Sequence, residues 1–371
     1  MLVGVPKEIK PGEYRVGLTP AAVGEYIAHG HRVVVETGAG DGISMSDAVY
    51  EAAGASIAKT AIEIFAAADM IVKVKEPQPG EWAQLRPKQI LFTYLHLAAD
   101  PDQARGLIES GVTAVAYETV TDARGNLPLL APMSEVAGRL SVQAAATALQ
   151  KANGGRGILL GGVPGVQPGK VVIIGGGVVG TQAARVAIGL GATVTVLDMS
   201  LPRLRELDDQ FAGRVGTRYS TRGALAEEVA TADVVVGAVL VPGATAPKLV
   251  TRPMLKTMKP GAVLVDVAID QGGCFETSHP TTHADPTFVV DGIVHYCVAN
   301  MPGAVPLTSS AALNHATLPF GLALADFGPA AIAANLHLRN GLNVHAGRIT
   351  HKAVAESLNL EFADPGLLMA A

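Results

Sequence analysis

A glycine-rich turn is the first feature of this chain that could do chemistry. Gly175, Gly177 and Gly180 fit the pattern G-x-G-x-x-G. The turn follows the β-branched run VVII, and Asp198 ends the next apolar run. Such glycines let the backbone approach a pyrophosphate, and the free N–H groups at the helix start favour its negative charge. The acid would accept hydrogen bonds from ribose hydroxyls, so the pattern predicts a dinucleotide site including Val178 of the GGGVVG turn.

Three further polar residues follow predicted strands in the first part of the chain. Arg15 lies in KPGEYRVGLTP, Lys75 closes the run IVKVK, and His96 follows FTYL. Ligands of open parallel sheets bind beyond the carboxyl ends of the strands, so we expect one shared edge. Arginine can hold a carboxylate, lysine can polarise a carbonyl, and imidazole can move a proton at neutral pH. Taken singly, Arg15 and Lys75 also fit solvated surface charges, and His96 also fits a buried core histidine.

Asp270 ends the run VLVDVAID. It is expected to lie in a second domain and to face Arg15, Lys75 and His96 across a cleft. An ordinary loop aspartate is the alternative for this residue. Asp266, inside the run, fits a structural hydrogen-bonding role better.

No metal site is predicted. His279 and His283 are four residues apart, but Pro280 between them disfavours a helical pair. No cluster of cysteines or acids completes a set of ligands.

The elements that must position these residues alternate between short apolar runs and helical patterns, which predicts an α/β fold of doubly wound parallel sheets. Thr19 and Pro20 predict a helix start, and Gly30 its end. A Pro-containing connector at 127–133 precedes a long Ala-rich helix from Ser134 to about Asn153. Strands are expected at 2–5, 32–36, 70–74, 90–94 and 113–116, and then at 171–174, 193–197, 234–238, 262–267 and 293–298.

Two connectors divide the chain into two predicted domains. Residues 130–303 would form a nucleotide-binding Rossmann domain, and residues 1–129 together with 304–371 a discontinuous substrate domain. A cleft between the two Rossmann-like domains would bring a cofactor and a small substrate together.

The composition indicates which classes of binding partner and which compartment to expect. The chain has 371 residues, of which 49% are hydrophobic and 16% charged, so it can fill buried parallel sheets. A net charge of −5 without a basic cluster argues against nucleic acid. Two cysteines give no disulfide framework, which favours a reducing cytoplasm. The start of the chain does not read as a signal peptide, and no segment is apolar enough to suggest a membrane partner.

Several runs together resemble the alanine dehydrogenase family over essentially the whole chain: GVPKEIKPGEYRVGLTP, VKVKEP, TYLHLA, PMSEVAGR and GGGVVG. The family is also similar to the nucleotide-binding part of proton-translocating transhydrogenase. The resemblance implies NAD-dependent, reversible oxidative deamination of L-alanine to pyruvate and ammonia by a homohexamer.

The resemblance also implies roles for individual residues. Arg15 and Lys75 would bind the substrate, and His96 and Asp270 would be the acid–base pair. Arg203 could accept the 2′-phosphate of NADP, but Asp198 would repel it, so NAD is the expected cofactor. The remaining residues implied to touch the cofactor are Ser134, Ser220, Val239, Leu240, Val267, Ala268, Ile269, Val298, Ala299, Asn300 and Met301.

Three alternatives remain open from the sequence. One is an amino-acid or opine-type dehydrogenase with a larger substrate. Another is a transhydrogenase-like subunit that binds NAD(H) without alanine turnover, and the third is a non-catalytic NAD sensor. The set of Arg15, Lys75 and His96 argues against a sensor, which needs none of them.

Overall fold

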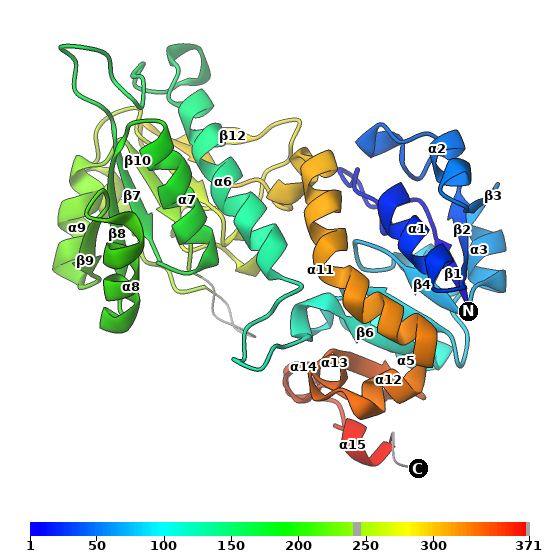
Figure 1. The fold of residues 1–371 in the computed structure, drawn as a ribbon. Helices are drawn as coiled ribbons and strands as arrows, with labels where there is room; N and C mark the ends of the chain where they lie inside the picture. The colour runs from blue at the N-terminus through cyan, green and yellow to red at the C-terminus, as the bar shows by residue number, and fades with distance from the viewer. Residues whose placement is uncertain (240–245, 369–371) are drawn as a thin grey trace. The chain divides into compact units, whose positions relative to one another are not determined.

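Two sheets, each in its own unit, organise the described residues, 1–239 and 246–368 of this computed structural model (Figure 1). Unit 1 consists of Met1–Met133 and Val305–Ala371, and unit 2 of Ser134–Ala304. The two sheets with their covering helices confirm the α/β class predicted from the alternating runs.

Six parallel strands form most of the sheet of unit 1, in the order β3-β2-β1-β4-β5-β6, and β14 and β15 extend it beyond β6. This is the strand order of a doubly wound nucleotide-binding fold. The strands are β1 (Leu2–Val5), β2 (Arg32–Glu36), β3 (Ser56–Ala58), β4 (Met70–Val72), β5 (Ile90–Thr93), β6 (Thr113–Ala116), β14 (Leu342–His345) and β15 (Arg348–Ile349).

The helices of unit 1 begin where the sequence offers caps. Thr19 Oγ1 accepts from the Ala22 amide, and Pro20 takes the first helical position of α1, as predicted. Helix α11 contacts α1 (Figure 1). The α-helices are α1 (Pro20–Ala28), α2 (Asp47–Ala52), α3 (Ala61–Ala67), α4 (Pro79–Trp82), α5 (Pro101–Ser110), α11 (Pro306–Phe327), α12 (Pro329–Ala334), α13 (Leu336–Asn340), α14 (Lys352–Leu358) and α15 (Pro365–Leu368).

Unit 2 repeats the same strand order as β9-β8-β7-β10-β11-β13, with β12 added antiparallel at the edge. Its strands are β7 (Lys170–Ile174), β8 (Thr193–Asp198), β9 (Gly216–Tyr219), β10 (Val234–Gly237), β11 (Val263–Asp266), β12 (Thr287–Val290) and β13 (Ile293–Tyr296). Its helices are α7 (Val178–Gly189), α8 (Leu201–Phe211), α9 (Arg222–Thr231) and α10 (Arg252–Leu255), and α6 (Ala131–Ala148) leads into it.

Small and branched residues fill both cores, as the scarcity of aromatic residues requires. In unit 2, Val171, Ile173, Val234 and Val236 alternate toward one face of the sheet and pack with Ala184. Strands buried on both faces read as continuous apolar runs, which is why the sequence revealed them.

Three details differ from the expectations. The sheets are mixed rather than wholly parallel, because β12, β14 and β15 pair antiparallel. Residues 131–133 are helical rather than part of a connector, since α6 begins at Ala131 and accommodates Pro132 in its first turn, where its missing N–H costs nothing. The α-helix ends at Ala148, and a short 3-10 turn covers Lys151–Asn153. None of the described helices has the length and apolar character needed to cross a membrane.

A buried ion-pair cluster lies beside the carboxyl end of β4. The Lys73 ammonium donates to Glu81 at 2.7 Å and to Glu8 at 3.1 Å, and Glu8 also accepts from the Val74 amide at 2.6 Å. All three charged side chains are at most 3% exposed. Burial alone would lower the pKa of Lys73, but the two carboxylates outweigh it and raise that pKa. Lys73 is therefore held charged in the interior.

Replacing Lys73 with methionine should lower the free energy of unfolding by about 3–5 kcal/mol, because two buried carboxylates lose their partner. Burial raises the pKa of Glu8, so the loss should shrink in acid, where a protonated Glu8 needs no cation. Urea unfolding measures both effects. Arg105→Met is the control: its pair with Asp102 is exposed and should contribute less than about 1 kcal/mol. Equal losses in the two variants would contradict this assignment.

Candidate active site

Neighbouring strands of unit 1 bring three of the predicted residues to one sheet edge. Arg15 lies between β1 and α1, Lys75 shortly after β4, and His96 shortly after β5. Strand β4 pairs with both β1 and β5 in parallel register, so the three loops leave the sheet on the same side. The strand order reverses at the boundary between β1 and β4. The carboxyl ends of the strands at such a boundary are the usual place for a ligand in these sheets.

Arg15 is buried and oriented by a neighbouring acid. Its Nε donates to Glu13 Oε1 at 2.7 Å, Nη2 contacts Glu13 Oε2, and Nη1 lies 3.0 Å from Met133 Sδ. Burial by itself lowers the pKa of Arg15, but Glu13 outweighs it and the pKa is raised. The guanidinium is thus a fixed cation with a defined plane.

Lys75 continues the chain beyond β4 in a half-buried position. Its carbonyl accepts from Thr93 Oγ1 at 3.0 Å, which ties the segment after β4 to the end of β5. Burial raises the pKa of the adjacent Glu76, but Lys75 and Lys10 outweigh this and lower it. Lys75 therefore follows a strand, β4, that pairs directly with β1, the strand before Arg15.

His96 adopts a backbone conformation that is uncommon for residues other than glycine, with φ +51° and ψ +35°. Its imidazole stacks on Tyr94, with ring centroids 5.7 Å apart and planes 4° from parallel. Tyr94 is itself fixed by a hydrogen bond from its hydroxyl to the Leu129 carbonyl at 2.6 Å. A strained backbone around a half-exposed imidazole is frequent at functional sites.

Two acids beside these residues were missed from the sequence. Glu13 orients Arg15, and Glu118 follows β6 and accepts from the His96 amide at 2.6 Å. The rule that found His96, a polar residue just past a strand, also applies to Glu118, two residues after β6 ends at Ala116.

Asp270 belongs to unit 2, where it is exposed in the 3-10 turn Ile269–Gln271 after β11. Asp266, at the end of β11, is fully buried and accepts from the amides of Ala268, Cys274 and Phe275 and from the Ser278 hydroxyl. Asp266 is therefore the structural acceptor expected, and it shapes the turn that carries Asp270.

The glycine-rich turn of unit 2 has the geometry that a pyrophosphate needs. Gly175 has φ +103°, and a Cβ there would lie 2.6 Å from the Ala238 carbonyl oxygen. A Cβ on Gly180 would lie 1.9 Å from the Gly175 oxygen, so helix α7 packs directly on the turn. At Gly177, the N-cap of α7, a Cβ would meet no atom within 4 Å. This open space stands over the unsatisfied N–H groups of the helix start.

Asp198 and Arg203 both bind the backbone of this turn. Asp198 accepts from the Gly176 amide at 2.7 Å and from the Ser200 amide at 2.8 Å. Arg203 donates to the Gly176 carbonyl and to Thr181 Oγ1, both at 2.7 Å, and pairs with Glu206. The arginine fork is thus engaged in the turn.

Most of the other residues implied to bind a cofactor follow neighbouring strands of unit 2. The Ser220 amide donates to the Asp198 carbonyl at 2.9 Å, and Val239 lies beside Gly175. Leu240 falls outside the described residues. The remaining ones are Ser134 near the start of α6, Val267, Ala268 and Ile269 after β11, and Val298, Ala299, Asn300 and Met301 after β13.

The two histidines considered as metal ligands have other partners. His279 stacks on Phe288 with ring centroids 3.7 Å apart, and His283 Nε2 lies 3.2 Å from the Asn300 carbonyl. Across residues 1–239 and 246–368, no group of three or more His, Cys, Asp or Glu side chains could hold a metal ion.

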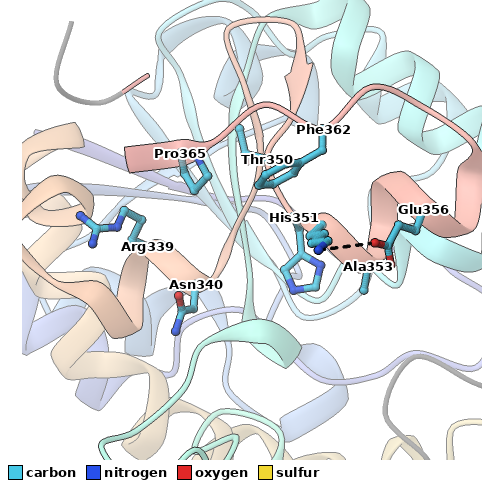
Figure 2. Close-up of a pocket in the computed structure, with 9 residues that line it drawn as sticks. Arg339, Asn340, Thr350, His351, Ala353, Glu356, Phe362 and Pro365 are labelled. Atoms are coloured by element: carbon cyan, nitrogen blue, oxygen red, sulfur yellow. Dashed lines mark ion pairs between the residues drawn. The ribbon is translucent and has the colours of Figure 1, made fainter. Parts of the chain in front are cut away.

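A pocket of about 530 Å³ lies elsewhere in unit 1, against α13 and α14 (Figure 2). None of the predicted site residues lines it. Its lining residues are Arg339, Asn340, Thr350, His351, Lys352, Ala353, Glu356, Phe362 and Pro365.

Gly180→Ala should destabilise unit 2 by about 1–3 kcal/mol, because the added methyl overlaps the Gly175 carbonyl. Gly189→Ala in the same helix has open space and should be neutral or stabilising by up to about 1 kcal/mol. Thermal unfolding of both variants, monitored by circular dichroism, compares them. A Gly180 variant as stable as the Gly189 variant would show that the turn does not depend on this contact.

Comparison with known proteins assigns the family. Residues 4–137 match the alanine dehydrogenase/PNT N-terminal domain, and residues 141–352 match its C-terminal domain. An alanine dehydrogenase of Halomonas elongata is 60% identical over the full length of both chains. A solved L-alanine dehydrogenase structure superposes with a TM-score of 0.94 at 51% identity, covering 97% of this chain and 99% of the other. The transhydrogenase structure from Sinorhizobium meliloti superposes with a TM-score of 0.82 at 27% identity, covering 95% of this chain and 100% of the other. The chain is therefore a dehydrogenase of the alanine dehydrogenase/PNT family.

Proposed function

We propose that this enzyme catalyses the NAD-dependent, reversible oxidative deamination of L-alanine to pyruvate and ammonia. The observation that carries the proposal is the set of Arg15, Lys75 and His96 at one sheet edge of a chain 60% identical to an alanine dehydrogenase. In this proposal residues 130–303 form the NAD domain, and residues 1–129 with 304–371 the substrate domain. It also includes a homohexamer working in the cytoplasm, as the family resemblance implies.

The glycine-rich turn of unit 2 fits NAD. The open space at Gly177 would accept the pyrophosphate at the start of α7, and Asp198 would accept hydrogen bonds from the ribose hydroxyls. The Arg203 guanidinium is engaged by the turn and by Glu206. This engagement supports NAD over NADP, because a 2′-phosphate would need the same guanidinium. When bound, the nicotinamide supplies a hydride acceptor. Val239, Val267–Asp270 and Val298–Met301, at the ends of neighbouring strands, would complete the site.

Arg15 and Lys75 would bind and orient the substrate. The guanidinium, held in one plane by Glu13, would take the alanine carboxylate, and the Lys75 ammonium would neutralise the carboxylate or the keto oxygen. Fixing a small substrate in this way lowers the entropic part of the barrier.

His96 and Asp270 would move protons. Oxidation at the substrate Cα gives an iminium ion, to which a water must add before ammonia can leave. His96 would assist that water as general base and return the proton to the departing nitrogen. Asp270 would be the second proton-transfer group.

The first test is the formation of NADH from NAD and L-alanine, with D-alanine, L-serine, L-lysine and NADP as controls. Turnover with L-alanine and NAD supports the proposal. Turnover only with a larger amino acid would favour the related dehydrogenases. Tight NADH binding without any turnover would favour a transhydrogenase-like subunit or an NAD sensor.

Lys75→Ala should lower alanine turnover by at least about a hundredfold while NADH affinity changes little, since Lys75 acts on the substrate. Steady-state kinetics and NADH fluorescence titration measure the two quantities. Lys59→Ala, an exposed lysine of the same unit, is the control. A loss of NADH affinity in the Lys75 variant would contradict the substrate role.

Asp198→Ala should raise the dissociation constant of NAD about tenfold and weaken the preference for NAD over NADP. Because Asp198 also accepts from the Gly176 amide, Asp198→Asn serves as a second variant that keeps an acceptor. Asp208→Ala on the exposed face of α8 is the matched control. Unchanged NAD affinity in both Asp198 variants would remove this residue from the site.

A further inference from the structure

Glu118 binds the backbone at His96, the residue that the proposed mechanism uses for proton transfer. Its carboxylate accepts from two consecutive amides, Leu95 at 3.2 Å and His96 at 2.6 Å. These amides lie where β5 ends and the backbone enters its left-handed turn at His96. One carboxylate thus satisfies both N–H groups of a bend that would otherwise be costly to hold.

The same carboxylate stands at ion-pair distance from the imidazole. Glu118 Oε1 lies 3.8 Å from His96 Nδ1, and the Glu118 side chain is only 14% exposed. The imidazole is fixed from another direction by its stack on Tyr94. The negative charge therefore faces Nδ1 and leaves Nε2 as the edge of the ring that can serve a substrate.

Other groups near Glu118 do not compete for this role. Burial raises the pKa of Tyr94, with Glu118 adding to the rise, so the phenol stays neutral. Burial lowers the pKa of His351, the N-cap of α14 that lines the pocket in Figure 2, although Glu118 partly opposes this. Helix α14 packs against the 3-10 turn after His96, and its Lys352 and Glu356 pair with each other at 3.9 Å. Of these groups, the His96 imidazole is the one that lies at ion-pair distance from Glu118.

We infer that Glu118 is a positioning residue for proton transfer: it holds the His96 backbone in its bend and sets its carboxylate against the Nδ1 edge of the imidazole. The inference rests on the proposed function for its kinetic consequence, but the geometry of the pair stands independently. When His96 takes a proton from the attacking water, Glu118 would balance the positive charge that forms on the ring.

Glu118→Gln tests the charge, because the amide oxygen can still accept from the backbone. We expect kcat to fall about tenfold or more while the KM for L-alanine changes less than about twofold. Glu109→Gln removes the same charge from the exposed face of α5 and should leave both constants unchanged.

A chemical readout makes the test independent of turnover. Diethyl pyrocarbonate acylates neutral imidazole, and peptide mass spectrometry gives the rate at His96. At about pH 7 the Glu118→Gln variant should react about two to four times faster than the parent, because the neutral amide no longer holds the Nδ1 edge of the ring as the carboxylate does. Glu118→Asp keeps the charge and should stay close to the parent at the same pH.

The outcomes separate the two proposals. If the parent lacks alanine turnover but the acylation rates differ as expected, the positioning role holds and the proposed function fails. If turnover is present, and Glu118→Gln leaves both kcat and the acylation rate unchanged, the positioning role is overturned. If Glu118→Asp loses as much kcat as Glu118→Gln and shows the same rise in acylation rate, the negative charge plays no part, which also overturns the inference.

Discussion

Both sheets share a constraint on which the candidate sites depend: parallel strands send all their carboxyl ends to one edge. In unit 1 the loops after β1, β4, β5 and β6 carry Arg15, Lys75, His96 and Glu118. In unit 2 the loop after β7 carries the glycine turn, and Asp198 is the last residue of β8. Residues far apart in the sequence thereby become neighbours in space without any strand having to bend toward a site.

The interior of unit 1 contains paired charged side chains near the same ends of the strands. Arg15 with Glu13, and Lys73 with Glu8 and Glu81, are ion pairs with almost no exposure. Burying a charge is costly unless it is paired and hydrogen-bonded, so each cation has a carboxylate fixed against it. The result is a rigid set of charges beside the sheet edge, and rigid charges can orient a small ionic substrate without reorganising.

Family membership and the proposed reaction rest on different kinds of observation. Matches over both domains, and a full-length relative at 60% identity, assign the family. The transhydrogenase structure shares the fold at 27% identity, so the fold alone does not choose between the two activities. The choice of L-alanine oxidation depends on what Arg15, Lys75 and His96 do, and that is why the tests act on substrate turnover and cofactor binding separately.

The sequence by itself determined the fold class, most central strands and the glycine turn, because buried strands read as apolar runs and tight turns demand glycine. Arg15, Lys75 and His96 could be named because each follows such a run. Edge strands such as β3 and β15 escaped, since short, partly exposed strands leave no clear pattern. The partners Glu13 and Glu118, and the engagement of Arg203 by the turn, were decided only by tertiary structure. Which acid stands against which cation depends on distances between loops, and spacing along the chain does not contain those distances.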